Sequence, residues 1–141
     1  MVPKDIISVQ QFIQEVQSVY KKWDLNKHLF FRGHCNDEYD LIPTVFRPIE
    51  KDKYYKEKEV LLDFKQYAPV HNINYDFITE RDKILVDMRH YGMPTRLLDW
   101  TITPLNSLYF ACCGDTANKN GEVIVFNAWK YWSRIIGFNE R

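Results

Sequence analysis

The stretch HLFFRG, residues 28–33, predicts a short β-strand in a chain whose other strong patterns are mostly helical. Its apolar residues 29–31 end at an arginine and a glycine, and a second apolar run from Val123 to Phe126 predicts another, buried strand. Few, short strands among several helices are typical of the α+β class. We therefore expect an α+β fold, a single compact domain in which several helices pack on a small mixed sheet.

Helical signals surround these two strands. Ser8 and Gln11 have the spacing of a capping box, and apolar residues then recur on one face as far as Trp23. Thr103 followed by Pro104 is typical of an N-cap and a first helical position. The predicted helices cover residues 8–23, 51–67, 79–92, 104–114 and 129–136. The apolar stripe of the helix after Thr103 is expected at Leu105, Leu108, Tyr109 and Cys112.

These patterns predict one domain over residues 1–141, without repeats or a linker. Residues 1–27 hold an N-terminal packing helix, residues 28–126 form the core that carries the unusual motifs, and residues 127–141 add a short C-terminal helix.

The composition is that of a globular protein with balanced charge. Of its residues, 45% are hydrophobic and 16% aromatic, and nineteen basic side chains balance nineteen acidic ones. Proteins that bind duplex nucleic acid through its phosphates usually have a basic excess or stripe, so this partner is disfavoured. No apolar run approaches the roughly 20 residues of a membrane helix, and no membrane association is expected.

The cysteines are Cys35, Cys112 and Cys113, an odd number with two adjacent members. Such a set makes a poor disulfide framework, so we expect reduced thiols that act as small buried hydrophobes in a cytoplasmic protein. Their spacing from the histidines matches no metal-ligand pattern, and no metal site is predicted.

Residues 88–114 contain only three formal charges, Arg89, Arg96 and Asp99, in an otherwise apolar, aromatic or small context. Isolated ions are costly to bury, so Arg96 and Asp99 are candidates for a mutual or a ligand-bridged pair. A buried Arg–Asp bridge that only fixes the loop is the structural alternative.

Asp99 leads directly to the predicted helix start at Pro104. Free N–H groups there, with the hydroxyls of Thr101 and Thr103, could receive a phosphate or another anion. The alternative is that Thr103 only caps the helix.

Arg32 ends the first predicted strand and is followed by Gly33 and His34. A guanidinium beside a glycine that admits a ligand to the backbone suits bidentate capture of phosphate or carboxylate. The alternative is an edge arginine in a salt bridge to one of the acids at positions 37, 38 and 40.

His90 and Tyr91 precede the turn Gly92-Met93-Pro94, which would fix their orientation. His90 could act as a general acid or base or donate to a ligand, because imidazole titrates near neutrality. A hydrogen-bonded structural histidine is the alternative.

Three motifs together give the chain a family resemblance: FRG at residues 31–33, LIPTVFR at 41–47 and HYGMPTRLLDWTITPLNSLYFA at 90–111. They closely resemble the FRG domain family, named after the first motif, and the likeness extends from about residue 30 to residue 126. The resemblance implies a bacterial or phage-related context, because members occur there, sometimes beside defence or toxin-like genes.

A more distant similarity connects the motifs to NAD-using ADP-ribosyltransferase-like folds, in one class of which an arginine ends the first strand. It implies that Arg32 holds the pyrophosphate, that Thr101 braces the strand and that an aromatic residue stacks on nicotinamide. The late-strand glutamate of such enzymes would correspond to Glu122. Since those folds have more strands than are predicted here, a truncated member or a fragment is one expectation.

Three functions are therefore open. The first is an NAD-binding or NAD-cleaving enzyme, with His90 and Glu122 as catalytic candidates and NAD as substrate. The second is a non-catalytic module that binds a nucleotide, another small phosphorylated ligand or a nucleic-acid end, and the third is a purely structural domain. Ligand capture through Arg32 and Arg96 is the favoured mechanism. The predicted ligand-binding residues are Arg32, Gly33, His34, Tyr91, Arg96, Asp99, Thr101 and Thr103.

Overall fold

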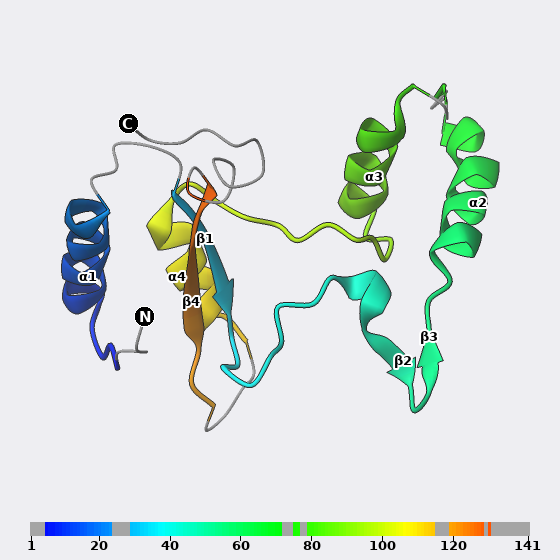
Figure 1. Ribbon diagram of the computed structural model, residues 1–141. Coiled ribbons are helices and arrows are strands. Elements are labelled where there is room, and N and C mark those ends of the chain that lie inside the picture. Colours follow the sequence, from blue (N-terminus) through cyan, green and yellow to red (C-terminus); the bar gives the residue numbers. More distant parts are fainter. Residues whose placement is uncertain are drawn as a thin grey trace. The chain divides into compact units, whose positions relative to one another are not determined.

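The computed structural model describes residues 5–23, 29–71, 75–76, 79–114, 119–128 and 130 (Figure 1). Contacts divide the chain into two compact units, the first made of residues 1–39 and 100–141 and the second of residues 40–99. Helices and antiparallel strands together make the fold α+β, as predicted. The predicted C-terminal helix over residues 129–136 lies almost entirely outside the described residues.

The first unit contains both strands that the sequence predicted. Strand β1 (Leu29–His34) pairs antiparallel with β4 (Glu122–Asn127), so that His34 lies opposite Glu122. The described strands thus form separate antiparallel pairs instead of the small mixed sheet that we expected, because a second pair lies in the other unit. Strand β4 is half-buried over its whole length, not fully buried.

Helix α1 (Val9–Lys22) confirms the N-terminal prediction. The hydroxyl of Ser8 accepts the amide of Gln11 at 3.2 Å, which satisfies one of the free N–H groups of the first turn. Val19 on its inner face packs with Leu29 and Phe31 of β1 in a buried cluster.

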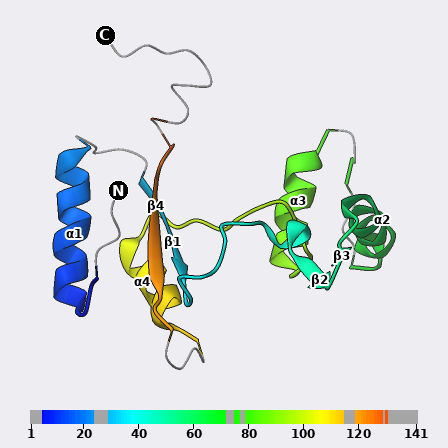
Figure 2. The same ribbon diagram turned by 60° about the horizontal axis from the view of Figure 1, so that its bottom comes forward.

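Helix α4 (Pro104–Cys112) lies beside the β1–β4 pair (Figures 1 and 2). It begins at Pro104 after the N-cap Thr103, as predicted. Its buried residues, however, are the small Ser107 and Ala111, while Leu105 is 52% and Tyr109 64% exposed. The predicted apolar stripe is therefore wrong.

Gly33 explains why small residues face β1. A Cβ at this position would lie 1.9 Å from the carbonyl oxygen of Ser107 and 2.7 Å from the amide nitrogen of Ala111. Gly121 meets the carbonyl of Ala111 in the same way, at 2.0 Å. The backbone of α4 occupies the space beside Gly33 that we expected a ligand to use.

The second unit begins with a 3-10 turn (η1, Thr44–Phe46) and a hairpin of β2 (Pro48–Glu50) and β3 (Lys53–Tyr54). Asp52 in the hairpin turn has φ 62°, a left-handed conformation that aspartate tolerates better than most residues. This turn delays the next helix, which we expected from residue 51.

Two helices form the rest of the second unit. Helix α2 (Glu57–Tyr67) continues into a 3-10 turn (η2, Ala68–His71), and α3 spans Arg81–His90. Their buried residues are Phe64, Ala68, Ile84 and Met88, which form one cluster.

Candidate functional site

The loop after α3 carries the longest motif of the sequence, and its start is fixed by the end of that helix. Gly92 has φ 77°, a conformation that glycine adopts without steric cost. Its amide donates to the carbonyl of Arg89 at 3.0 Å, and the amide of Met93 donates to that of Met88 at 2.9 Å. These hydrogen bonds cap the C-terminus of α3 and fix the direction in which the loop at residues 93–99 leaves the helix.

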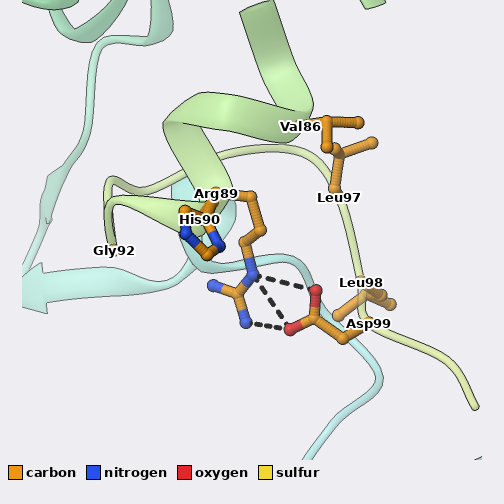
Figure 3. Close-up of a pocket in the computed structure, with 7 residues that line it drawn as sticks. All are labelled: Val86, Arg89, His90, Gly92, Leu97, Leu98 and Asp99. Atoms are coloured by element: carbon orange, nitrogen blue, oxygen red, sulfur yellow. Dashed lines mark hydrogen bonds and ion pairs between the residues drawn. The ribbon is translucent and has the colours of Figure 1, made fainter. Parts of the chain in front are cut away.

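Arg89 and Asp99 form the first ion pair of this loop (Figure 3). The Nε of Arg89 lies 3.2 and 3.0 Å from the two carboxylate oxygens, and Nη2 lies 2.5 Å from Oδ2. Hydrogen bonding to Asp99 raises the pKa of Arg89 above its ordinary value, so the guanidinium stays charged. The Arg89 side chain is 28% and the Asp99 side chain 62% exposed, which makes this a surface pair.

Arg96 forms the second ion pair, with Glu57 in the first turn of α2. Its Nε donates to Oε1 at 2.6 Å, and Nη2 donates to Oε2, so the contact is bidentate. Hydrogen bonding to Arg96 holds the pKa of the Glu57 carboxyl below its usual range.

These contacts correct the expected pairing of Arg96 with Asp99. Each of the two residues has a different ion-pair partner, and both partners come from helices. The Arg96 side chain is half exposed, so the structural alternative of a buried Arg–Asp bridge is also wrong.

Two threonines that sequence reasoning missed connect the motifs of the second unit. Thr95 is 1% exposed; its carbonyl accepts the amide of Val45 at 3.3 Å, and its hydroxyl accepts the amide of Leu97 at 3.3 Å. Nη1 of Arg89 lies 3.4 Å from the hydroxyl of Thr44. The stretch at residues 41–47 therefore packs directly on the loop at 90–99.

An open hollow of about 630 Å³ lies beside the Arg89–Asp99 pair (Figure 3). Its lining residues are Val86, Arg89, His90, Gly92, Leu97, Leu98 and Asp99. His90 thus lies where it could meet a ligand. Tyr91 is 58% exposed, and its ring lies 5.7 Å from that of His90 and 6.5 Å from that of Phe64.

In the first unit, three predicted site residues come together on the β1–β4 pair. The Nε of Arg32 donates to Nε2 of His34 at 3.0 Å, and Nδ1 of His34 lies 3.3 Å from Oε1 of Glu122. His34 is only 5% exposed. Arg32 and His34 are two residues apart on one strand, so their side chains share a face with Glu122.

The same face of the ribbon carries aromatic side chains. Phe30 and Phe126 lie opposite each other in the register, and the ring of Phe126 lies 5.6 Å from that of Trp100. An arginine, a buried histidine, a glutamate and aromatic rings therefore follow one another along this face.

Thr101 joins the end of the long motif to the first strand. Its amide donates to the carbonyl of Phe31 at 2.9 Å and its carbonyl accepts the amide of Phe31 at 2.7 Å. The Thr101 hydroxyl accepts the amide of Thr103 at 3.0 Å. Thr101 thus braces β1, and Thr103 serves as the N-cap of α4.

Arg32 belongs to the first unit, whereas Tyr91, Arg96 and Asp99 belong to the second. The structure thus places Arg32 with His34 and Glu122 in the first unit, and the Arg89–Asp99 and Arg96–Glu57 ion pairs in the second.

Comparison with known proteins decides the family. The sequence model of the FRG domain matches residues 27–120, two-thirds of the chain. The chain belongs to the FRG domain family. No curated protein and no solved structure matches it significantly.

In this FRG domain the three letters of the first motif have distinct structural roles. Phe31 is fully buried in the cluster that it forms with Val19 and Leu29. Arg32 points to the other face of the strand, where it donates to His34, and Gly33 lets α4 approach the strand. Only the arginine offers a group that a ligand could contact.

The thiols of the FRG domain differ from the expectation. Cys112 and Cys113 are exposed and Cys35 is half-buried, so the adjacent pair does not act as buried hydrophobes. Among the described residues, no three His, Cys, Asp or Glu side chains gather as a metal site would require, and no helix is long and apolar enough to cross a membrane.

Proposed function

We propose that this FRG domain binds a small phosphorylated ligand of nucleotide type on the face of β1 and β4 that carries Arg32. The observation that supports the proposal most is the hydrogen bond from Arg32 to the buried His34, next to aromatic rings on the same face. A half-buried arginine whose orientation is fixed binds a phosphate better than a freely rotating surface side chain.

The neighbouring groups match the rest of such a ligand. A base or nicotinamide ring can stack on an aromatic side chain, which contributes about 1–3 kcal/mol per ring in single-stranded nucleic-acid complexes. Trp100 and Phe126 supply rings on this face. Among the described residues of β1 and β4, Arg32 is the one guanidinium, which suits a small anion better than a nucleic-acid duplex that needs many phosphate contacts.

The hollow in the second unit is a further predicted place of ligand contact, through His90 and Asp99 of its lining. The other predicted ligand-binding residues of this unit, Tyr91 and Arg96, are not among its lining residues. We assign the hollow the smaller part, because the Asp99 side chain is 62% and the Arg96 side chain 50% exposed, so neither is held as firmly as a buried group. A ligand that used either residue would have to compete with an ion pair.

Binding is tested by calorimetry with ADP, ADP-ribose and NAD on the full chain. Arg32→Ala should weaken binding at least tenfold, because it removes a charged hydrogen-bond donor. Arg47→Ala is the control, since Arg47 is an exposed motif arginine whose Nε donates to the backbone carbonyl of Ile42. Equal loss in both variants, or no binding of any of the three ligands at millimolar concentration, would contradict the proposal.

Glu122 favours a second candidate, cleavage of NAD by an ADP-ribosyltransferase-like reaction. It starts the late strand β4, where the distant similarity implies a glutamate, and the register places it on the same face as Arg32. The reaction breaks the bond between nicotinamide and ribose, releases nicotinamide and passes ADP-ribose to water or another acceptor. A cytoplasmic role in bacterial or phage defence belongs to the same proposal, and it rests on the contexts in which the family occurs and on the odd cysteine count of the sequence.

Nicotinamide release from NAD tests this second candidate. Glu122→Gln should abolish release and leave NAD binding within about threefold, because the amide keeps the size of the carboxylate. Glu38→Gln is the control, since Glu38 is an exposed carboxylate of the same unit that pairs with Lys119. Binding without release by the wild-type protein would leave the binding function and eliminate the enzymatic one.

A further inference from the structure

His34 is the most enclosed ionisable side chain of the first unit's charged group. It is 5% exposed and has three polar or aromatic neighbours: Arg32 on its own strand, Glu122 on β4, and the ring of Tyr39 at 6.3 Å. Burial of an imidazole is costly unless its two nitrogens meet suitable partners. The arrangement around His34 therefore constrains which nitrogen carries the proton.

The contact with Arg32 decides the tautomer. Because Nε of Arg32 is always a donor, Nε2 of His34 must accept and cannot carry a hydrogen. A neutral His34 then carries its proton on Nδ1, which faces Glu122. Nδ1 is 3.3 Å from Oε1, close enough for attraction, but its geometry is not that of a hydrogen bond, and it has no other hydrogen-bond partner among the described residues.

We infer that His34 is a positioning residue, which holds the guanidinium of Arg32 in place through Nε2 while its Nδ1 lies close to the carboxylate of Glu122. The inference rests on the proposed function, because Arg32 is the group that would contact the ligand phosphate. A bond to Nε fixes the guanidinium plane about the last side-chain torsion. The direction in which the terminal nitrogens can meet an anion is then set before the ligand arrives.

Two amide substitutions separate the two nitrogens of the imidazole. In His34→Gln the side-chain carbonyl reaches the position of Nε2 and can accept from Arg32. In His34→Asn the amide ends near the position of Nδ1 and can donate only toward Glu122. Removing a residue that orients a metal ligand typically costs about 10–100-fold in metal affinity, and we take the lower end of that range for a residue that orients an arginine. We expect His34→Asn to weaken ADP-ribose binding at least tenfold and His34→Gln to stay within about threefold of wild type.

A measurement without ligand tests the inference independently of the proposed function. Long-range nitrogen–proton correlation spectra of the wild-type protein report the tautomer of His34, and the same spectra follow the Nε–H of Arg32. The expected result is a neutral ring protonated on Nδ1, with an Arg32 Nε–H that exchanges slowly in wild type and His34→Gln but rapidly in His34→Asn.

The outcomes are distinguishable. A ring protonated on Nε2, or an Arg32 signal equal in all three proteins, overturns the role of His34 whether or not a ligand binds. Equal affinity of both amide variants also overturns it. If no ligand binds the wild-type protein, the proposed function fails, and the tautomer and Arg32 exchange still decide whether His34 positions the guanidinium. Circular dichroism and thermal unfolding confirm that both variants fold.

Discussion

Substituting Gly33 by alanine should destabilise the FRG domain more than the same substitution at Gly92, the glycine that follows α3. The new Cβ would lie 1.9 Å from the carbonyl oxygen and 2.9 Å from the carbonyl carbon of Ser107. Both atoms belong to the backbone of α4, so no side-chain rotation can relieve the overlap. The helix would have to retreat by about 1 Å or more to restore van der Waals distance.

The energetic cost follows from the loss of this close packing. Overpacking in a core typically costs about 1–3 kcal/mol, and a rigid backbone obstacle places Gly33→Ala at the upper end, about 3 kcal/mol or more. At about 2–4 °C per kcal/mol, the melting temperature should fall by roughly 10 °C. Gly92→Ala is the matched control: it has open space but φ 77°, and should cost only about 1 kcal/mol.

Urea and thermal unfolding of the full chain measure both variants. A second variant tests the cause: Ser107→Gly removes a side chain but no backbone atom, so it should not rescue Gly33→Ala. Rescue, or a loss below about 1 kcal/mol in Gly33→Ala, would refute the packing argument. A variant with wild-type stability that has lost only ligand binding would instead support a glycine kept for ligand access.

Three further predictions concern charged and titrating groups. Because the pKa of Glu57 is lowered in the folded protein, its contribution to stability is present above pH 4.5 and is lost as the pH falls through the folded pKa; Glu57→Gln should be less stable than wild type at pH 7 and equally stable near pH 2 in urea unfolding. Burial and a hydrogen bond to a carboxylate raise the pKa of Tyr75 to about 12, so stability should fall between pH 10 and pH 12, and absorbance titration should show one late tyrosine that Tyr75→Phe removes. A double-mutant cycle of Arg89→Ala and Asp99→Ala should give a coupling energy of about 0.5–1 kcal/mol, falling in high salt, since the pair is partly exposed; coupling indistinguishable from zero at low salt would contradict the pairing.

Local signals predicted the elements whose residues interact with near neighbours. The Ser8 cap, the Thr103-Pro104 helix start and the Gly92 stop all act within one helical turn, and each lies where the sequence indicated. Both strands of the first unit were also predicted, because a short apolar run bounded by polar residues or glycine has few alternatives.

Contacts over longer separations could not be predicted in this way. The partner of Arg96 lies 39 residues away, on a helix whose first turn contains more than one acid, so spacing could not select Glu57. Which side of α4 is buried depends on Gly33. Because this residue has no Cβ, the helix backbone approaches the strand closely, and the small side chains of Ser107 and Ala111 are buried there in place of the larger apolar ones. The hairpin at residues 48–54 depends on a left-handed aspartate that composition alone does not reveal.

The candidate site shows the same division. Arg32, His34 and Glu122 were each singled out, and the register of β1 and β4 brings them together. The link between Arg32 and His34 required only the two-residue period of a strand, whereas Glu122 could be aligned only once the pairing was known. The contacts of Arg89 with Asp99 and of Thr95 with Val45 were not predicted, because in each case the partner lies outside the helix or loop to which the residue belongs.

The antiparallel pairing of β1 with β4 has a consequence for how the chain folds. The partners Leu29 and Asn127 are far apart in the sequence, and the residues of the second unit, 40–99, come between the two strands in chain order. The entropy lost when this long loop closes grows only with the logarithm of its length. The loss nevertheless occurs before the contacts between β1 and β4 can compensate for it. If residues 40–99 fold first, Phe31 and Thr101 meet across a structured segment, and their two backbone hydrogen bonds become an early long-range contact. The expected order of folding is then the inserted unit first, the contact between Phe31 and Thr101 next, and the pairing of β1 with β4 last.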